Sequence, residues 1–290
     1  MQSKIIPPTE VVTNFKGAFL EVCYRGYSAL GRTPHKVSDQ ARKWHYEPSY
    51  PPCYYAQARY RFLKTLAIAK SMHFKSVLEV AAGGGFNGIC LHEPGRRTVL
   101  NDMRFLDEEI KAWPNSEDIE IIIGNLLELD PKKIGHFDLV MACEVIEHVA
   151  HGDELIEHLR KFLNPAGKLL ITTPNGAYFR SKLSTYSEVS NFSELEKRQF
   201  KPDADGHLYL YTPEEITELL KKTGFHDIQV DLSITPWLSG HMGMRLLPSS
   251  RSLTSFYFKL DKLSMKLGFS VQRKLCTQMI IVASQTKGCR

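Results

Sequence analysis

The stretch VLEVAAGGGFNG, from Val77 to Gly88, decides the fold. An apolar run breaks into glycines, as a buried strand does where it turns sharply into a helix. Such a turn usually holds a ligand against its backbone. The ligand could be a phosphate, a dinucleotide or a group of opposite charge.

Strand and helix patterns alternate from Ser76 onward. The clearest helical pattern covers residues 153–165, and Thr212-Pro213-Glu214-Glu215 is a clean helix start. Strands alternating with helices predict an α/β fold, a doubly wound and mostly parallel sheet covered on both faces. The expected strands are 76–81, 97–102, 119–124, 137–143, 167–174, 225–234 and 276–284.

Two segments lie outside this alternation. Residues 1–75 are predicted to form an N-terminal helical extension, with a helix running up to the first strand, and residues 76–290 to form the α/β domain. Within that domain, residues 176–206 form a long polar insertion with aromatic side chains. A connection of that length is usually functional, and we expect a lid. The alternative is that its aromatic residues pack the insertion onto the core.

Composition excludes several classes of protein. The 290 residues are 43% hydrophobic and 24% charged, which is ordinary for a soluble globular protein. The net charge of +5 is spread along the chain and favours a solvated basic surface over a nucleic-acid partner. The six cysteines show no zinc spacing, and the chain shows no signal peptide. We therefore expect a cytoplasmic protein.

The glycine-rich turn satisfies the pattern G-x-G-x-x-G with Gly83, Gly85 and Gly88. A P-loop is excluded because no Gly-Lys-Ser/Thr follows. A dinucleotide loop stays open, because Asp102 lies near the end of the second strand at about the distance expected for a ribose contact.

Glu79 argues against a dinucleotide. Its carboxylate stands where the first strand meets the turn, and it would repel a pyrophosphate there. A ligand that carries an ammonium and a sulfonium would be attracted instead, and S-adenosylmethionine carries both. The alternative role for Glu79 is to cap the helix that follows.

From about Arg59 to Gly224 the sequence resembles class I S-adenosylmethionine-dependent methyltransferases. VLEVAAGGGF resembles the family's first motif, with Ala81 in place of a glycine, a change that we expect to be tolerated if φ is negative there. LNDM resembles the second motif, and IIGNLLEL the third, with Asn125 where Asp is usual. FDLVMACEVIEHV is similar to a signature of small-molecule methyltransferases, the ubiquinone-biosynthesis O-methyltransferases among them.

The resemblance implies a Rossmann-like sheet of seven strands with the last one antiparallel, and a ligand at the carboxyl ends of strands one and four. Asp102 and Met103 would flank the ribose and adenine, and Asn125 would bond the adenine amino group. Arg59 would hold the cofactor carboxylate or be a solvated helix residue. The expected cofactor residues are Arg59, Glu79, Ala81, Gly83, Gly85, Asp102, Met103, Asn125, Leu126 and Cys143.

Two histidines are candidates for a catalytic base. His148 follows the fourth strand and His207 follows the insertion; either could instead be a histidine without catalytic duty. The spacing of Glu144, Glu147 and His148 places them on one face of a helix. A similar E-x-x-E-H in the ubiquinone O-methyltransferase group has been linked to a divalent metal. We assign no metal ligands and leave that question open.

The acceptor is expected to be a small molecule, a lipid-linked precursor or a glycan, methylated on oxygen rather than nitrogen. The segment after the fourth strand lacks the [DN]-P-P-[YF] of enzymes that methylate nucleic-acid amines. Two rival functions are a nucleotide-dependent oxidoreductase and a non-catalytic module that keeps the cofactor pocket.

One basic amphipathic segment, residues 252–268, bears on possible partners. Its apolar face is expected to pack on its own domain, and contact with a membrane is the alternative. The quaternary state is expected to be a monomer or a homodimer.

Overall fold

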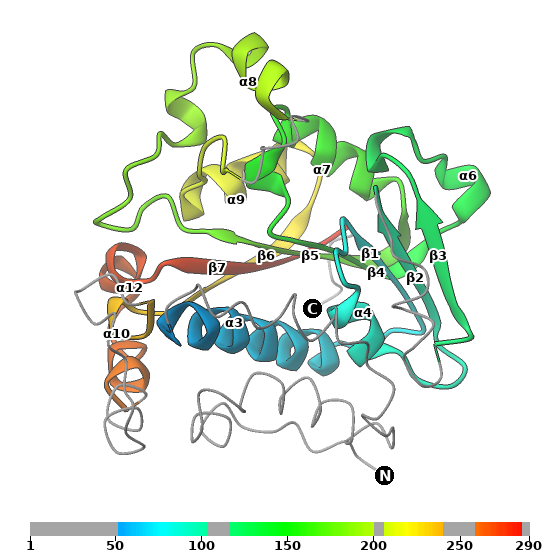
Figure 1. Cartoon of the computed structure of the whole chain (residues 1–290), viewed down its shortest axis with the longest axis horizontal. Helices are drawn as coiled ribbons and strands as arrows, with labels where there is room; N and C mark the ends of the chain where they lie inside the picture. The colour runs from blue at the N-terminus through cyan, green and yellow to red at the C-terminus, as the bar shows by residue number, and fades with distance from the viewer. Residues whose placement is uncertain (1–51, 104–115, 200–205, 240–258, 286–290) are drawn as a thin grey trace.

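A computed structural model describes residues 52–103, 116–199, 206–239 and 259–285 of the chain. Its centre is one seven-stranded sheet in the order β3-β2-β1-β4-β5-β7-β6 (Figure 1). The first five strands run parallel, and β7 is antiparallel to both β5 and β6. The strands are β1 (Ser76–Val80), β2 (Arg97–Asp102), β3 (Ile119–Ile123), β4 (Phe137–Cys143), β5 (Leu163–Pro174), β6 (His226–Ser233) and β7 (Gln278–Ser284).

The predicted strands and the antiparallel last strand are confirmed. The strand order reverses at β1, which lies between β2 and β4. Open α/β sheets bind their ligands beyond the carboxyl ends of the strands at such a switch point. The glycine-rich turn follows β1 directly, so the fold places it at that point.

Helices cover both faces of the sheet, as Figure 1 shows. One face carries α3 and α4, and the other carries α7 and α9. The helices with bounds inside the described residues are α3 (Pro52–Ser71), α4 (Phe86–Leu91), α6 (Pro131–Ile134), α7 (Gly152–Arg160), α8 (Phe192–Gln199), α9 (Pro213–Lys222), α10 (Pro236–Ser239) and α12 (Phe269–Leu275). The 3₁₀ turns are η3 (Leu126–Glu128), η4 (Ile146–His148) and η5 (Tyr186–Glu188), and residues 259–264 are also helical.

Successive side chains of a strand point to opposite faces of the sheet, so each central strand contributes to the core under both helix layers. Leu139 and Met141 of β4 pack with Leu66 and the rest of the α3 face. Val140, between them, packs with Ile156 on the α7 face. Both sides of the strand are therefore buried, which explains the continuous apolar runs in the sequence.

The helix start predicted at Thr212 is confirmed by a reciprocal capping box. The Glu215 amide donates to the Thr212 hydroxyl at 3.2 Å, and the Thr212 amide donates to the Glu215 carboxylate at 2.7 Å. Two amides at the start of α9 are thereby satisfied by local side chains.

The aromatic residues of the insertion pack against the domain in most of the described positions. Tyr186 stacks on Tyr211 with ring centroids 5.0 Å apart, and Phe192 lies edge-on to Tyr186. Tyr178 is buried, whereas Phe179 is exposed. The insertion is thus joined to the core by aromatic contacts, as its packing alternative expected.

Two sequence predictions fall partly outside the described residues. Phe200 of the insertion lies outside the described residues, and so do residues 252–258 of the amphipathic segment. Among the helices that the structure describes, none has the length and apolar character needed to cross a bilayer.

Candidate functional site

The turn after β1 is fixed by backbone and side-chain hydrogen bonds to the end of β2. The Ala82 amide donates to the Asn101 carbonyl at 2.9 Å, and the Gly83 amide donates to the Asp102 carboxylate at 2.8 Å. Gly85 adopts φ 69° and forms the N-terminal cap of α4. The first two sequence motifs therefore form one structural unit, with Asp102 holding the turn.

The condition under which Ala81 was expected to be tolerated, a negative φ, is not met. Its φ is 46°, in the left-handed region that favours glycine. The motif that this stretch resembles has a glycine at this place, which adopts this φ freely, whereas a Cβ there brings strain of roughly 1–2 kcal/mol. Ala81 is exposed, so its methyl group meets no packing obstacle that would add to this cost.

Glu79 occupies the predicted place but faces the protein. It is 2% exposed, and its two oxygens accept from the Asn87 amide group and the Gly88 amide, both at 2.7 Å. Burial raises the pKa of Glu79 to about 7, against the opposing effect of these hydrogen bonds. The contacts match the capping alternative: in this structure Glu79 braces the start of α4.

The predicted adenine side is formed by the ends of β2 and β3. Asp102 is half-buried and Met103 is 55% exposed. Asn125 caps η3, because its side-chain oxygen accepts from the Leu127 amide at 3.2 Å. The oxygen expected to bond adenine thus already has one partner and keeps one lone pair. Leu126 is buried in the core beneath it.

The two remaining cofactor predictions lie on β4 and α3. Cys143 ends β4 beside Thr172 of β5. Burial raises the pKa of its thiol well above the ordinary value, so the side chain is a neutral thiol. Arg59 belongs to α3, and its side chain lies outside what the structure describes.

His148 and His207 lie together, although the insertion separates them in the sequence. Their ring centroids are 5.0 Å apart at an interplanar angle of 71°. The Leu208 amide donates to the Glu147 carbonyl at 2.9 Å and ties the end of the insertion to η4. Burial and the neighbouring His148 lower the pKa of His207, which favours its neutral, proton-accepting form.

Glu147 completes a cluster with these histidines. One ligand atom from each of Glu147, His148 and His207 lies within 4.8 Å of the others. Glu147 is fully buried; its Oε2 accepts from the Thr173 hydroxyl at 3.0 Å, whereas its Oε1 has no hydrogen-bond partner. Burial, with the nearby Glu144, raises its pKa well above the ordinary value. A buried oxygen without a partner is costly unless a proton or a cation faces it.

Glu144 is not part of this cluster, so the predicted face of Glu144, Glu147 and His148 does not form. Glu144 precedes η4 with φ 56°, outside any helix. Its carboxylate accepts from Arg61 and Thr172, both at 2.8 Å. Arg61 was missed by sequence reasoning, because only the docking of α3 brings it to the end of β4.

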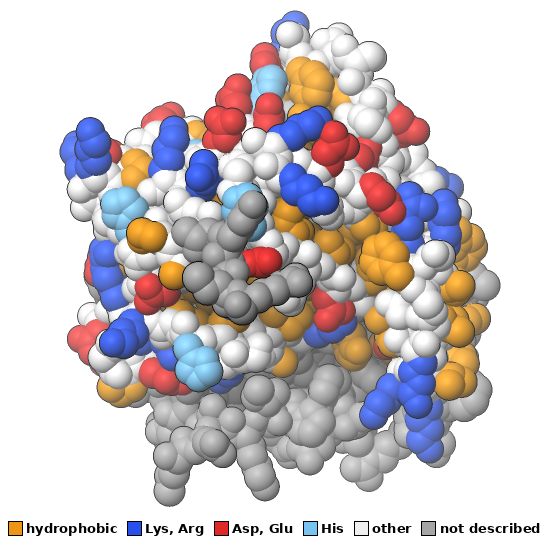
Figure 2. Space-filling view, turned by 180° about the vertical axis from the view of Figure 1, so that it is seen from behind, with side chains coloured by type: hydrophobic (Ala, Val, Ile, Leu, Met, Phe, Trp, Pro, Cys, Tyr) orange, Lys and Arg blue, Asp and Glu red, His pale blue; other side chains and the backbone are white. Residues whose placement is uncertain are grey.

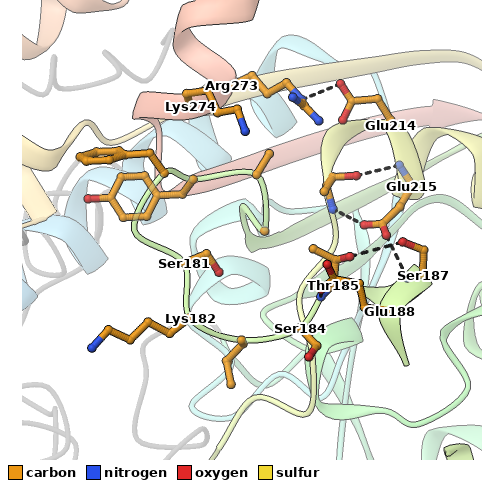
Figure 3. Close-up of a pocket in the computed structure, with 16 residues that line it drawn as sticks. Ser181, Lys182, Ser184, Thr185, Ser187, Glu188, Glu214, Glu215, Arg273 and Lys274 are labelled. Atoms are coloured by element: carbon orange, nitrogen blue, oxygen red, sulfur yellow. Dashed lines mark hydrogen bonds and ion pairs between the residues drawn. The ribbon is translucent and has the colours of Figure 1, made fainter. Parts of the chain in front are cut away.

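A polar cavity of about 600 Å³ lies beyond the end of β5 (Figure 3). Arg273 and Lys274 line one side, and the segment with Thr185 and Glu188 lines another. The Ser181 hydroxyl is buried at its wall and has no hydrogen-bond partner. None of the predicted cofactor residues lines this cavity, so it is a separate space beside their site.

The carboxylates around the cavity are engaged by the protein. Glu214 pairs with Arg273 at 2.7 Å, and Glu215 accepts from the Ser187 amide at 2.9 Å. Lys274 has no ion-pair partner in the described part of the chain. The cavity therefore offers donors and an uncompensated cation to a polar ligand.

Comparison with known proteins gives a family match. The profile of a family described as a methyltransferase domain matches residues 44–230. A protein of Mycolicibacterium smegmatis named as a probable S-adenosylmethionine-dependent methyltransferase is 28% identical over 153 residues, 52% of each chain. A ubiquinone biosynthesis O-methyltransferase of Rickettsia conorii is 30% identical over 102 residues, 34% of this chain and 35% of that one. The chain thus spans about half the length of the first relative and about a third of the length of the second.

Solved structures are more distant in sequence. A protein of Thermotoga maritima described as a possible histamine N-methyltransferase is 15% identical, with a TM-score of 0.49, over 79% of this chain and 90% of that chain. A phosphoethanolamine N-methyltransferase of Haemonchus contortus in complex with S-adenosyl-L-methionine is 18% identical, with a TM-score of 0.48, over 90% of this chain and 60% of that chain.

Proposed function

Because the chain belongs to the methyltransferase domain family, we propose that it transfers the methyl group of S-adenosylmethionine to an oxygen of a small-molecule or glycan acceptor. One juxtaposition carries the proposal. The glycine-rich turn follows β1 and the histidine pair follows β4, and these strands are paired neighbours through Val80 and Ala142. A donor site and a proton acceptor thus stand at adjacent strand ends.

The donor side of this proposal rests on the turn. Gly83 and Gly85 have positive φ and carry no side chains, so a ligand can approach the backbone closely. Asp102 stays at the edge of the turn as a hydrogen-bond acceptor for a ribose. Glu79 supports the turn from beneath, since its oxygens already accept hydrogen bonds from Asn87 and Gly88 of α4.

The reaction needs alignment and removal of one proton. The acceptor oxygen displaces the sulfur at the methyl carbon, and the bonding electrons remain on sulfur, which leaves S-adenosylhomocysteine. The hydroxyl proton passes to a neutral imidazole of the His148 and His207 pair. His207 suits this role, because its lowered pKa keeps it unprotonated near neutral pH. An amine acceptor that binds as an ammonium would also have to lose a proton before it could attack the methyl group. The histidine pair therefore does not by itself exclude a nitrogen acceptor.

A divalent cation at Glu147, His148 and His207 is a second candidate for activating the acceptor. The observation that favours it is the unpartnered and buried Oε1 of Glu147. Carboxylate and imidazole ligands suit ions such as zinc or manganese. Such an ion would lower the pKa of an acceptor hydroxyl. The roles proposed for the glycine-rich turn and Asp102 in cofactor binding would stay the same.

The cavity beside α12 is proposed to hold the part of the acceptor that does not react. Thr172 pairs with Cys143 at the end of β4, and the cavity begins at Gly176. At about 3.3 Å per residue, these points are separated by roughly 10–15 Å. An acceptor that reaches both would be a polar, extended molecule such as a glycoside.

The test combines binding and turnover on the full chain. Calorimetry is expected to show binding of S-adenosylhomocysteine and none of NAD, and labelled methyl transfer into a metabolite extract is expected to identify an acceptor. NAD binding would support the oxidoreductase, and cofactor binding without any incorporation would support a non-catalytic module. Repeating the transfer after chelation and with added Zn²⁺ or Mn²⁺ tests the cation; unchanged rates would exclude it.

A further inference from the structure

The segment after residue 258 presents its apolar side chains to the solvent. Half of the large apolar side chains exposed in the described part of the chain lie between Leu263 and Val271. They are Leu263 at 61%, Leu267 at 44%, Phe269 at 50% and Val271 at 45% exposed. The expectation that this face packs on its own domain is wrong for Leu263 and Leu267.

The polar side of the same segment faces the protein. Asp261 is 1% exposed and accepts from the Thr235 amide at 2.9 Å and from the Thr235 hydroxyl. The Trp237 indole donates to the Ser264 hydroxyl at 3.2 Å. These buried hydrogen bonds fix the orientation of the segment, so the outward position of Leu263 is built in and not a consequence of loose packing.

Basic side chains accompany the exposed apolar ones. Lys259, Lys262, Lys266 and Lys274 are all exposed. Asp261 is the only acidic residue between positions 259 and 275, and it is buried. We call the eight residues Leu263, Leu267, Phe269, Val271, Lys259, Lys262, Lys266 and Lys274 the apolar–basic edge. Along the right-hand edge of Figure 2, hydrophobic and basic side chains lie next to each other.

We propose that the apolar–basic edge docks the protein on the surface of a bilayer that contains anionic lipid. Apolar side chains interleaved with lysines match an interfacial layer, where the former enter the headgroup boundary and the latter meet lipid phosphates. A second copy of the chain is a poorer partner. A two-fold contact would bring two sets of lysines together with no exposed carboxylate on the edge to compensate them.

Docking would also orient the cavity. Lys274 belongs to both the apolar–basic edge and the cavity lining, and the Phe179 amide donates to the Lys274 carbonyl at 3.0 Å, which places the exposed Phe179 beside the edge. The cavity mouth would then lie near the lipid headgroups and suit an amphiphilic acceptor. That consequence rests on the proposed function, whereas docking does not, so the two are measured separately.

The test is sedimentation of the full chain with vesicles of phosphatidylcholine, with and without phosphatidylserine, at low and high salt. Binding is expected only with the anionic lipid, and it is expected to weaken as salt rises. The triple variant Lys259→Gln/Lys262→Gln/Lys266→Gln should bind about a hundredfold more weakly, from roughly fivefold per lysine. Leu263→Ser/Leu267→Ser should also lose binding.

Matched controls lie on the opposite edge of the sheet. Ile123→Ser removes an equally exposed apolar side chain, and Lys132→Gln/Lys133→Gln removes two exposed lysines. Both should bind vesicles like the wild type. The variants of the apolar–basic edge and Lys132→Gln/Lys133→Gln should keep their binding of S-adenosylhomocysteine. The proposal is overturned by absence of vesicle binding, by equal losses in the controls, or by self-association that Leu263→Ser/Leu267→Ser abolishes while vesicles leave the protein in solution.

Discussion

The imidazole rings of His148 and His207 meet nearly edge to face, with centroids 5.0 Å apart, although the whole insertion separates them in the sequence. Two bases at this distance oppose each other's protonation. The hydrogen bond from the Leu208 amide to the Glu147 carbonyl holds them there. The segment that follows the insertion therefore contributes directly to the chemistry proposed for the end of β4.

Replacing His207 with Gln is expected to reduce kcat by about a hundredfold or more, because the acceptor proton then lacks its base. Binding of S-adenosylhomocysteine should be unchanged. Since the pKa of His207 lies below its ordinary value, the wild-type rate should stay level at neutral pH and fall only below about pH 6.5. His136→Gln, at an exposed histidine, is the control; equal rates in both variants would contradict the role of His207.

Replacing Asp102 with Ala should weaken binding of S-adenosylmethionine at least tenfold, since hydrogen bonds to charged groups contribute about 1.5–3 kcal/mol. The variant loses both the predicted ribose acceptor and the bond that holds the Gly83 amide. Calorimetry measures the change. Asp118→Ala, at an exposed carboxylate before β3, should leave the affinity as it was. If Asp102→Ala also binds normally, the ribose has been placed wrongly.

Stability should depend on pH through Glu79. Its pKa in the folded protein is raised from 4.5 to about 7. A raised pKa means that the folded state favours the protonated carboxyl, so this contribution to stability is complete below about pH 4.5 and is lost as pH rises to about 7.

The free energy of unfolding should therefore fall by up to about 3 kcal/mol across that range in the wild type, relative to Glu79→Gln, which cannot ionise. Denaturant titrations of both proteins at several pH values measure the difference. Parallel curves would show that Glu79 is not the titrating group.

Replacing Ala81 with Gly should stabilise the protein by about 1 kcal/mol, because glycine adopts φ 46° without strain. The neighbouring Ala82→Gly is the matched control. Ala82 does not have a positive φ, and it packs against the cluster of Ile89, Leu100 and Ile119, so its replacement should destabilise the protein by about 0.5–1 kcal/mol. Thermal unfolding of the two variants should shift in opposite directions; a fall in both would refute the strain at Ala81.

The sequence by itself determined the elements that depend on a few consecutive residues. The apolar run of β1, its break at Gly83 and the helix start at Thr212 are local signals, and each appeared where it was expected. The order of the motifs also predicted that the end of β2 lies beside the glycine-rich turn, because neighbouring parallel strands end at the same edge of a sheet.

Only the tertiary structure decided which side chains meet across long separations. The pairing of Arg61 with Glu144 and the return of His207 to Glu147 depend on how α3 and the insertion dock. The exposure of the Leu263 side chain depends on the hydrogen bond that the Thr235 amide donates to the Asp261 carboxylate. Periodicity in the sequence identifies an amphipathic segment, but it does not tell which face of the segment will pack against the rest of the protein. Buried hydrogen bonds between distant residues can stabilise the packing of the polar face more than burial of the apolar face would.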